Sequence, residues 1–122
     1  MWPFSPKLSI EYPKMGDGVR ALTIVYGNGN SGKLGVRLFV FSPDGRWYIQ
    51  PRPVWHTQWR WSCKCFIGNA KSEPGHTFQI VAADSSLGIA QGALYEPEAR
   101  LLRNPPKSLK VSNIVNVYLM YD

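Results

Sequence analysis

The sequence predicts an all-β protein, an antiparallel β-sandwich of seven or eight strands with one short helix before the last strand. Ten prolines and eleven glycines supply many turns, and aromatic residues make up 13% of the 122 residues. Short apolar runs recur between turn signals at a spacing typical of sandwiches with Greek-key connections. A chain of this length can bury its own core. We therefore expect one domain over residues 1–122, with residues 1–6 as an N-terminal arm.

The first half of the chain divides into strands at clear turn signals. We expect strands in residues 7–13, 19–27, 33–41 and 46–50. The third is nearly continuous in apolar residues, which is typical of a strand in the middle of a sheet. Residues 42–45 form the strongest turn signal, because their proline presets φ and their glycine accepts a positive φ. The third and fourth strands should therefore pair as a hairpin.

The second half has one segment of a different kind. Two prolines place residues 51–56 at a sheet edge or in a bend, because proline cannot donate a ladder hydrogen bond. Strands follow in residues 58–68 and 77–84. Good helix formers in residues 87–102 predict one short helix or helical turn. The last strand, in residues 109–122, has apolar side chains at every second position.

The net charge of +6 is concentrated in one third of the chain. Residues 33–71 carry seven basic side chains and only one acidic side chain, Asp44. A concentrated positive field raises the rate of encounter with an anionic partner. The alternative is a solvated face that keeps the domain soluble, and the composition alone leaves both interpretations open.

One strand carries both cysteines and two of the five tryptophans, in the stretch WRWSCKCFIG at residues 59–68. Alternation divides its side chains between two faces. The first face holds Trp59, Trp61, Cys63, Cys65 and Ile67; the second holds Arg60, Ser62, Lys64 and Phe66. Tryptophans next to free thiols and isoleucine indicate a core face. A nucleic-acid or sugar platform, the alternative, would combine its rings and cations on one face.

The cysteines do not indicate a metal site. His56, Cys63, Cys65 and His76 are the only four soft ligands in the chain. Residues i and i+2 of a strand lie about 6.6 Å apart along its axis, whereas two thiolates on one zinc ion each lie about 2.3 Å from the metal. A bridge between the two cysteines would also close a small, strained ring. We expect free thiols, no metal and no cofactor.

Other enzyme motifs are incomplete. Residues 27–34, GNGNSGKL, imitate a phosphate-binding loop, but Leu34 replaces the required hydroxyl and a strand follows in place of a helix. No local motif joins a histidine to a cysteine for nucleophilic catalysis. We therefore expect a non-enzymatic protein, with a small cysteine- or zinc-dependent enzyme as a distant alternative.

The sequence contains no targeting or membrane signal that we can identify. Its first residues lack the apolar region and cleavage site of a signal peptide, and no run of eighteen apolar residues could span a bilayer. Free cysteines mildly favour a reducing compartment. We expect a cytoplasmic location and no membrane partner.

The order of signals over residues 8–84 resembles bacterial immunoglobulin-like accessory modules. The resemblance rests on IEYPKMGDGVRALTIVYG, on RLFVFSPDGRWYIQPRPV, on the tryptophan strand ending in FIG, and on GHTFQIVAAD. It implies an immunoglobulin-like sandwich that serves as an accessory or adhesion-type interaction module. It assigns no functional residue, because the matching positions are turns and core.

These observations together predict a binding or scaffolding module that recognises another protein. Its expected surface is the basic side of the domain, formed by Arg46, Arg52, Trp55, Arg60 and Lys64. The alternative is that residues 46–64 bind an anionic polymer, either nucleic acid or an acidic glycan. The sequence does not predict an oligomeric state.

Overall fold

The computed structural model describes residues 7–29, 36–43, 47–68, 73–84, 101–102 and 112–120. Within these ranges the regular structure is entirely β, and no residue is helical. Seven strands have three residues or more, as the sequence predicts, and three are two-residue segments. The strands are β1 (Ser9–Tyr12), β2 (Gly18–Val19), β3 (Leu22–Asn28), β4 (Val36–Phe41), β5 (Trp47–Ile49), β6 (Val54–Trp55), β7 (Arg60–Phe66), β8 (Thr77–Asp84), β9 (Leu101–Leu102) and β10 (Val115–Leu119).

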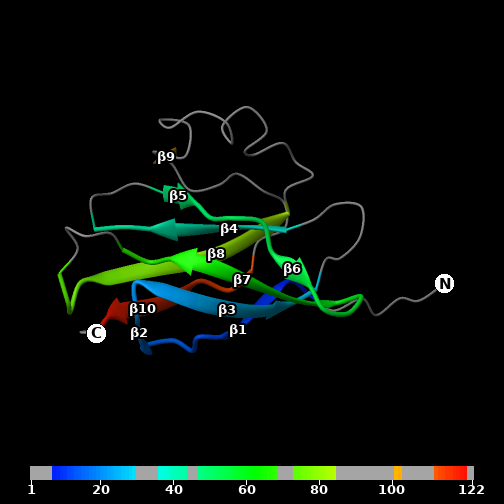
Figure 1. The fold of residues 1–122 in the computed structure, drawn as a ribbon, viewed down its shortest axis with the longest axis horizontal. Coiled ribbons are helices and arrows are strands. Elements are labelled where there is room, and N and C mark those ends of the chain that lie inside the picture. The colour runs from blue at the N-terminus through cyan, green and yellow to red at the C-terminus, as the bar shows by residue number, and fades with distance from the viewer. Residues whose placement is uncertain are drawn as a thin grey trace.

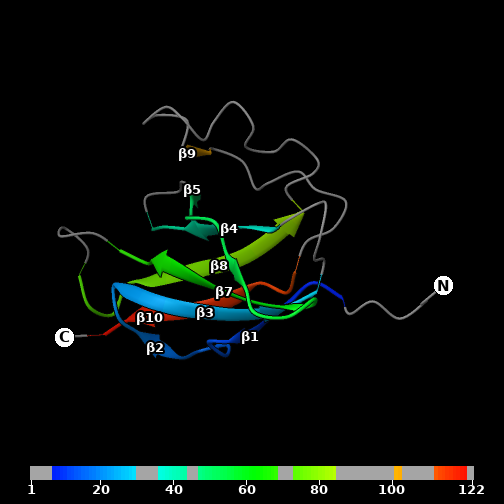
Figure 2. The same ribbon diagram turned by 45° about the vertical axis from the view of Figure 1, so that its right-hand side comes forward.

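The strands form two sheets that pack face to face (Figures 1 and 2). Sheet A has the order β1-β3-β7-β6, and sheet B has the order β2-β10-β8-β4-β5-β9. One cluster of buried side chains joins the sheets, with Val25, Trp61 and Cys65 from sheet A against Leu38 and Ile80 from sheet B. The predicted all-β class is confirmed, and the strands form two sheets.

Strand β7 has one buried and one exposed face. It pairs with β3 over seven residues, from Leu22 opposite Phe66 to Asn28 opposite Arg60. Trp61, Cys63 and Cys65 are buried between the sheets, whereas the residues between them point away from the core. The predicted division is therefore correct for Arg60–Phe66, but Trp59, expected on the core face, lies in the bend before β7, is half-buried and does not belong to the core cluster.

Strand β4 is buried on both faces. Its neighbours are β8 and β5, the second of which completes the predicted hairpin. Leu38 belongs to the core between the sheets, and Arg37 and Phe39, which point the other way by alternation, are buried as well. This is the central position that the apolar run predicts.

Side chains protect the edges of sheet A. The segment with Pro51 and Pro53 leads into the short edge strand β6, as predicted. Strand β6 pairs only with the first part of β7. Farther along β7, the Phe66 N–H donates to Oε1 of Gln50 at 2.7 Å. At the opposite edge Asn113 accepts from the Ile10 N–H at 2.8 Å through Oδ1. Exposed strand edges invite unwanted pairing, and these bonds occupy backbone groups that would otherwise be open.

Two expectations need correction. The strand expected over residues 19–27 is interrupted near Arg20: β2 belongs to sheet B and pairs with β10 in parallel, so the sheets are not wholly antiparallel. Parallel neighbours need a long connection between them, and most of the chain lies between these two strands. The helix expected over residues 87–102 falls mainly outside the described residues, but Leu101 and Leu102 form a strand next to β5.

Candidate functional site

The outer face of sheet A exposes large hydrophobic side chains. Five of them, each between 46% and 61% exposed, are Tyr12, Leu22, Tyr26, Val54 and Phe66. Polar and basic groups from β7 lie among them: Arg60, Ser62 and Lys64. We call these eight residues the open face.

Strand register brings the open face together from distant parts of the sequence. Tyr12 lies opposite Tyr26, Tyr26 opposite Ser62, and Ser62 opposite Val54, so one row crosses all four strands. Leu22 and Phe66 form a second pair. The rings of Tyr12 and Tyr26 have centroids 6.2 Å apart at an interplanar angle of 57°, within the range of favourable aromatic pairs.

The structure brings together only part of the predicted basic surface. Arg60 and Lys64 share the open face, about 13 Å apart along β7. Arg52 is exposed in the segment before β6, whereas Trp55 is half-buried and packs against the core. Arg46 lies outside the described residues.

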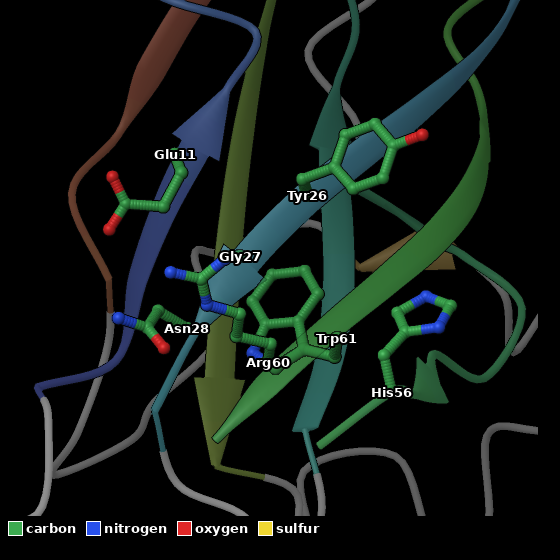
Figure 3. A pocket seen from close by; sticks show the side chains of 7 residues that line it. All are labelled: Glu11, Tyr26, Gly27, Asn28, His56, Arg60 and Trp61. Atoms are coloured by element: carbon green, nitrogen blue, oxygen red, sulfur yellow. The ribbon is translucent and has the colours of Figure 1, made fainter. Parts of the chain in front are cut away.

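A pocket of about 560 Å³ lies at the Arg60 end of sheet A, and we call it the Arg60 pocket. Its lining residues are Glu11, Tyr26, Gly27, Asn28, His56, Arg60 and Trp61. In Figure 3, Glu11 and Asn28 border one side, Tyr26 and His56 border the other, and the Trp61 ring lies between them. Tyr26 belongs to both the pocket and the open face, which are therefore continuous.

Gly27 makes room for the Trp61 indole. A Cβ atom built on Gly27 would overlap Cζ2 and Cη2 of that ring, so only glycine allows this close approach. The indole is buried, and its Nε1–H has no hydrogen-bond acceptor among the described residues. A buried donor without an acceptor costs about 1–3 kcal/mol.

The charged groups of the pocket are not neutralised by each other. The described residues include no ion pair between Arg60 and Glu11. Glu11 Oε1 accepts a hydrogen bond from Ser9 Oγ at 3.0 Å. Among the described residues, the Arg60 guanidinium therefore lines the pocket without a carboxylate partner.

His56 and Ser62 form the one arrangement that suggests catalysis within the described ranges. His56 Nε2 lies 2.7 Å from Ser62 Oγ, within reach for a base and a nucleophile. An active pair also needs a third group that orients the histidine, and the hydrogen bonds of the described residues supply none for its ring. The geometry gives no case for an acyl-transfer site.

The two cysteines are free and buried, as predicted. The Cys63 thiol donates to the Pro51 carbonyl at 3.1 Å, and the Cys65 thiol donates to Cys63 Sγ at 3.7 Å. That shared hydrogen bond and burial raise the pKa of Cys65. The same hydrogen bond, aided by the charge of Arg37, lowers the pKa of Cys63.

The spacing argument against a shared metal needs correction. Two sulfur ligands of a tetrahedral zinc ion lie about 3.8 Å apart if each is about 2.3 Å from the metal, and the observed separation is close to that. The side chains converge although their backbone positions are far apart. The described residues nevertheless contain no group of three or more His, Cys, Asp or Glu side chains that could hold a metal ion.

Sequence analysis missed several members of the site. The outward direction of Leu22 and Tyr26 could be predicted from the alternation of β3, but their proximity to Tyr12 and Phe66 depends on strand pairing. Glu11 and Asn28 gave no signal in the sequence. A pocket formed by three strands and the residue after β6 has no local motif.

Comparisons with known proteins add no family. No protein-family model matches the chain, and no curated protein matches it. The resemblance over residues 8–84 therefore stays a prediction.

In the part of the chain that the structure describes, no helix is long and apolar enough to cross a membrane.

Proposed function

We propose that this protein is a non-enzymatic interaction module that binds a partner protein through the open face. The observation that carries the proposal is the group of five large hydrophobic side chains, about half exposed, on one face of one sheet. Contiguous apolar patches on soluble proteins commonly mark interaction sites. Water contact with these side chains is unfavourable, and a partner would remove it.

The composition of the open face supports a protein partner. Tyrosine, phenylalanine and arginine are enriched in the centres of protein interfaces, and polar residues are typical of their rims. Tyr26 and Phe66 supply rigid rings, and Arg60 and Lys64 lie beside them. Ser62 adds a small hydroxyl in the central row.

The immunoglobulin-like assignment is part of the same proposal. Variable-type immunoglobulin domains have one sheet of four strands in the order ABED. In their second sheet, the strands C′ and C″ are added next to the strands G, F and C. The orders β1-β3-β7-β6 and β10-β8-β4-β5 agree with that arrangement. Since a fold does not define a function, the proposed role depends on the open face.

A site-specific crosslinking experiment tests the proposed function. The photoreactive residue p-benzoylphenylalanine replaces Phe66 in one sample and Tyr118 in a matched control. Tyr118 is 42% exposed but lies on β10 of sheet B. We expect a protein crosslink from position 66 and none from position 118 in the source cell. The captured protein is then purified and titrated against the wild type and a Tyr26→Ser, Phe66→Ser variant, which should weaken binding by at least about tenfold.

Three results would contradict the proposed function. They are equal crosslinking from both positions, crosslinking only to a second copy of this chain, and unchanged affinity of the double variant. A melting temperature close to that of the wild type is required of every variant. This control separates loss of the surface from loss of the fold.

A second candidate function is binding of an anionic polymer. The observation that favours it is that Arg60 and Lys64 share a face with Tyr26 and Phe66. Alternation along residues 59–67 separates the tryptophans from the cations, but Phe66 shares the face of the cations, and pairing with β3 adds Tyr26. Rings beside cations form the platforms that bind single-stranded nucleic acid.

Retention on heparin and on single-stranded DNA tests this second function. Phosphate or sulfate contacts make binding weaker as the salt concentration rises. We expect salt-sensitive retention that disappears when Arg52, Arg60 and Lys64 are all replaced by alanine. Absence of retention at low salt would exclude binding of an anionic polymer as the function.

A further inference from the structure

The Arg60 pocket combines a cation with a hollow large enough for a small ligand. Its volume of about 560 Å³ lies within the range of pockets that hold small ligands. The described residues provide no ion pair for the guanidinium of Arg60. Since Tyr26 borders both regions, a partner on the open face could extend one side chain into the pocket.

We propose that the Arg60 pocket receives a carboxylate side chain, Asp or Glu, from an acidic segment of the partner protein. This inference rests on the proposed protein-binding function and names the chemistry of the partner. The segment would place separate apolar side chains against Tyr26 and Phe66, which lie about 13 Å apart along the strands, and its carboxylate against Arg60.

Charge complementarity selects a carboxylate. The planar guanidinium of arginine matches a carboxylate with two parallel hydrogen bonds. Asn28, on the neighbouring strand β3 opposite Arg60, can donate from its side-chain amide. Arg52 and Lys64 are exposed as well, and their positive charge would raise the rate at which an acidic segment meets the domain.

Glu11 limits how much negative charge the pocket accepts. Its carboxylate borders the side of the pocket that Asn28 also lines (Figure 3). A second anionic group on the ligand would meet repulsion there. The pocket therefore favours one carboxylate next to neutral or donor groups, which describes an acidic peptide side chain better than a polyanion.

The Trp61 indole reports on the pocket. It lines the pocket, and its Nε1–H has no acceptor among the described residues. A negative charge placed beside this ring would change the resonance of that proton. The signal follows binding directly and does not require the partner to be known.

Nuclear magnetic resonance titration of the full chain tests the inference. The probe is N-acetyl-glutamate N-methylamide, and its uncharged control is the corresponding glutamine compound. We expect a saturable shift of the Trp61 Nε1–H with a Kd in the range of about 1–10 mM for so small a probe. The glutamine compound should bind at least about tenfold more weakly, because it cannot form the charged pair.

Two variants localise the binding. Arg60→Gln should weaken the glutamate probe by at least about tenfold, whereas Lys64→Gln, which removes the other cation of the open face, should change the Kd by less than about twofold. Equal affinity for the glutamate and glutamine probes would overturn the inference. So would an effect of Lys64→Gln as large as that of Arg60→Gln.

Glucuronate provides a third arm. Binding of glucuronate about tenfold tighter than the glutamate probe would assign the pocket to an acidic glycan and overturn the acidic peptide. The crosslinking from position 66 separates this inference from the proposed function. A protein crosslink without binding of the glutamate probe contradicts only the inference about the pocket. Binding of the probe without a crosslink contradicts the interaction module and its partner protein, and leaves only a pocket that binds a carboxylate.

Discussion

Strands β4 and β7 lie in facing sheets and are similar in length, yet they differ in how many of their faces are exposed to solvent. Both faces of β4 are buried, whereas β7 buries one face and exposes the other. The difference is visible in their sequences, because VRLFVF is almost continuously apolar, whereas RWSCKCF alternates between polar and apolar residues from Arg60 to Cys65. A strand with one open face can carry a binding surface without losing its place in the core.

The arginines of the two strands lie in opposite environments, one buried and one exposed. Arg37 of β4 is buried, and its Nη2 donates to the Gln50 carbonyl at 2.7 Å. Buried cations need such partners, because their desolvation is costly. Arg60 of β7 is exposed beside the pocket. The first arginine therefore serves the fold, and the second is free to bind a ligand.

Matched phenylalanines provide the largest expected contrast. Phe39 of β4 is 0% exposed and Phe66 of β7 is 51% exposed. Phe39→Ala should lower the free energy of unfolding by about 3–5 kcal/mol, because it leaves a cavity. Phe66→Ala should change it by about 0.5 kcal/mol or less, as for other surface substitutions. Urea denaturation of both variants measures the difference, and similar losses would refute the assignment of an open face.

A smaller effect on stability is expected where Gly27 of β3 meets Trp61 on the inner face of β7. Gly27→Ala adds a methyl group where the Trp61 ring already lies, and such overpacking costs about 1–3 kcal/mol. Trp61→Phe removes the part of the ring that would clash. The double variant should therefore be more stable than the sum of the two single effects predicts. Strict additivity in urea denaturation would show that the ring and Gly27 are not in contact in solution.

Alternation and proline position explain what the sequence could predict. The alternation of polar and apolar residues along β7 predicted that Trp61 and Cys65 belong to the core. Two prolines predicted that β6 lies at a sheet edge. These signals are local, because side chains of a strand alternate whatever its neighbours are. The same signal predicted β4 as a central strand.

Long-range pairing explains what the sequence could not predict. β2 has only two residues, Gly18 and Val19, which are too few for a periodic pattern. Nothing in the sequence therefore predicted that β2 belongs to sheet B. Tyr12 and Tyr26 meet only because β1 pairs with β3. The convergence of the two cysteine sulfurs depends on side-chain rotamers, which backbone spacing does not define.

Thiol labelling examines the two faces of β7 through the reactivity of cysteine side chains. Cys63 and Cys65 are buried on the inner face, so they should react with an aromatic disulfide reagent only when the structure opens locally. A cysteine introduced by Ser62→Cys, in a background with both native cysteines replaced by alanine, lies on the outer face next to His56. It should react at least about 100-fold faster than the native thiols, because no opening is needed. Urea-unfolded protein provides the reference rate for each thiol. Equal rates in the folded protein would mean that the strand exposes both faces, and the distinction between core and binding surface would then fail.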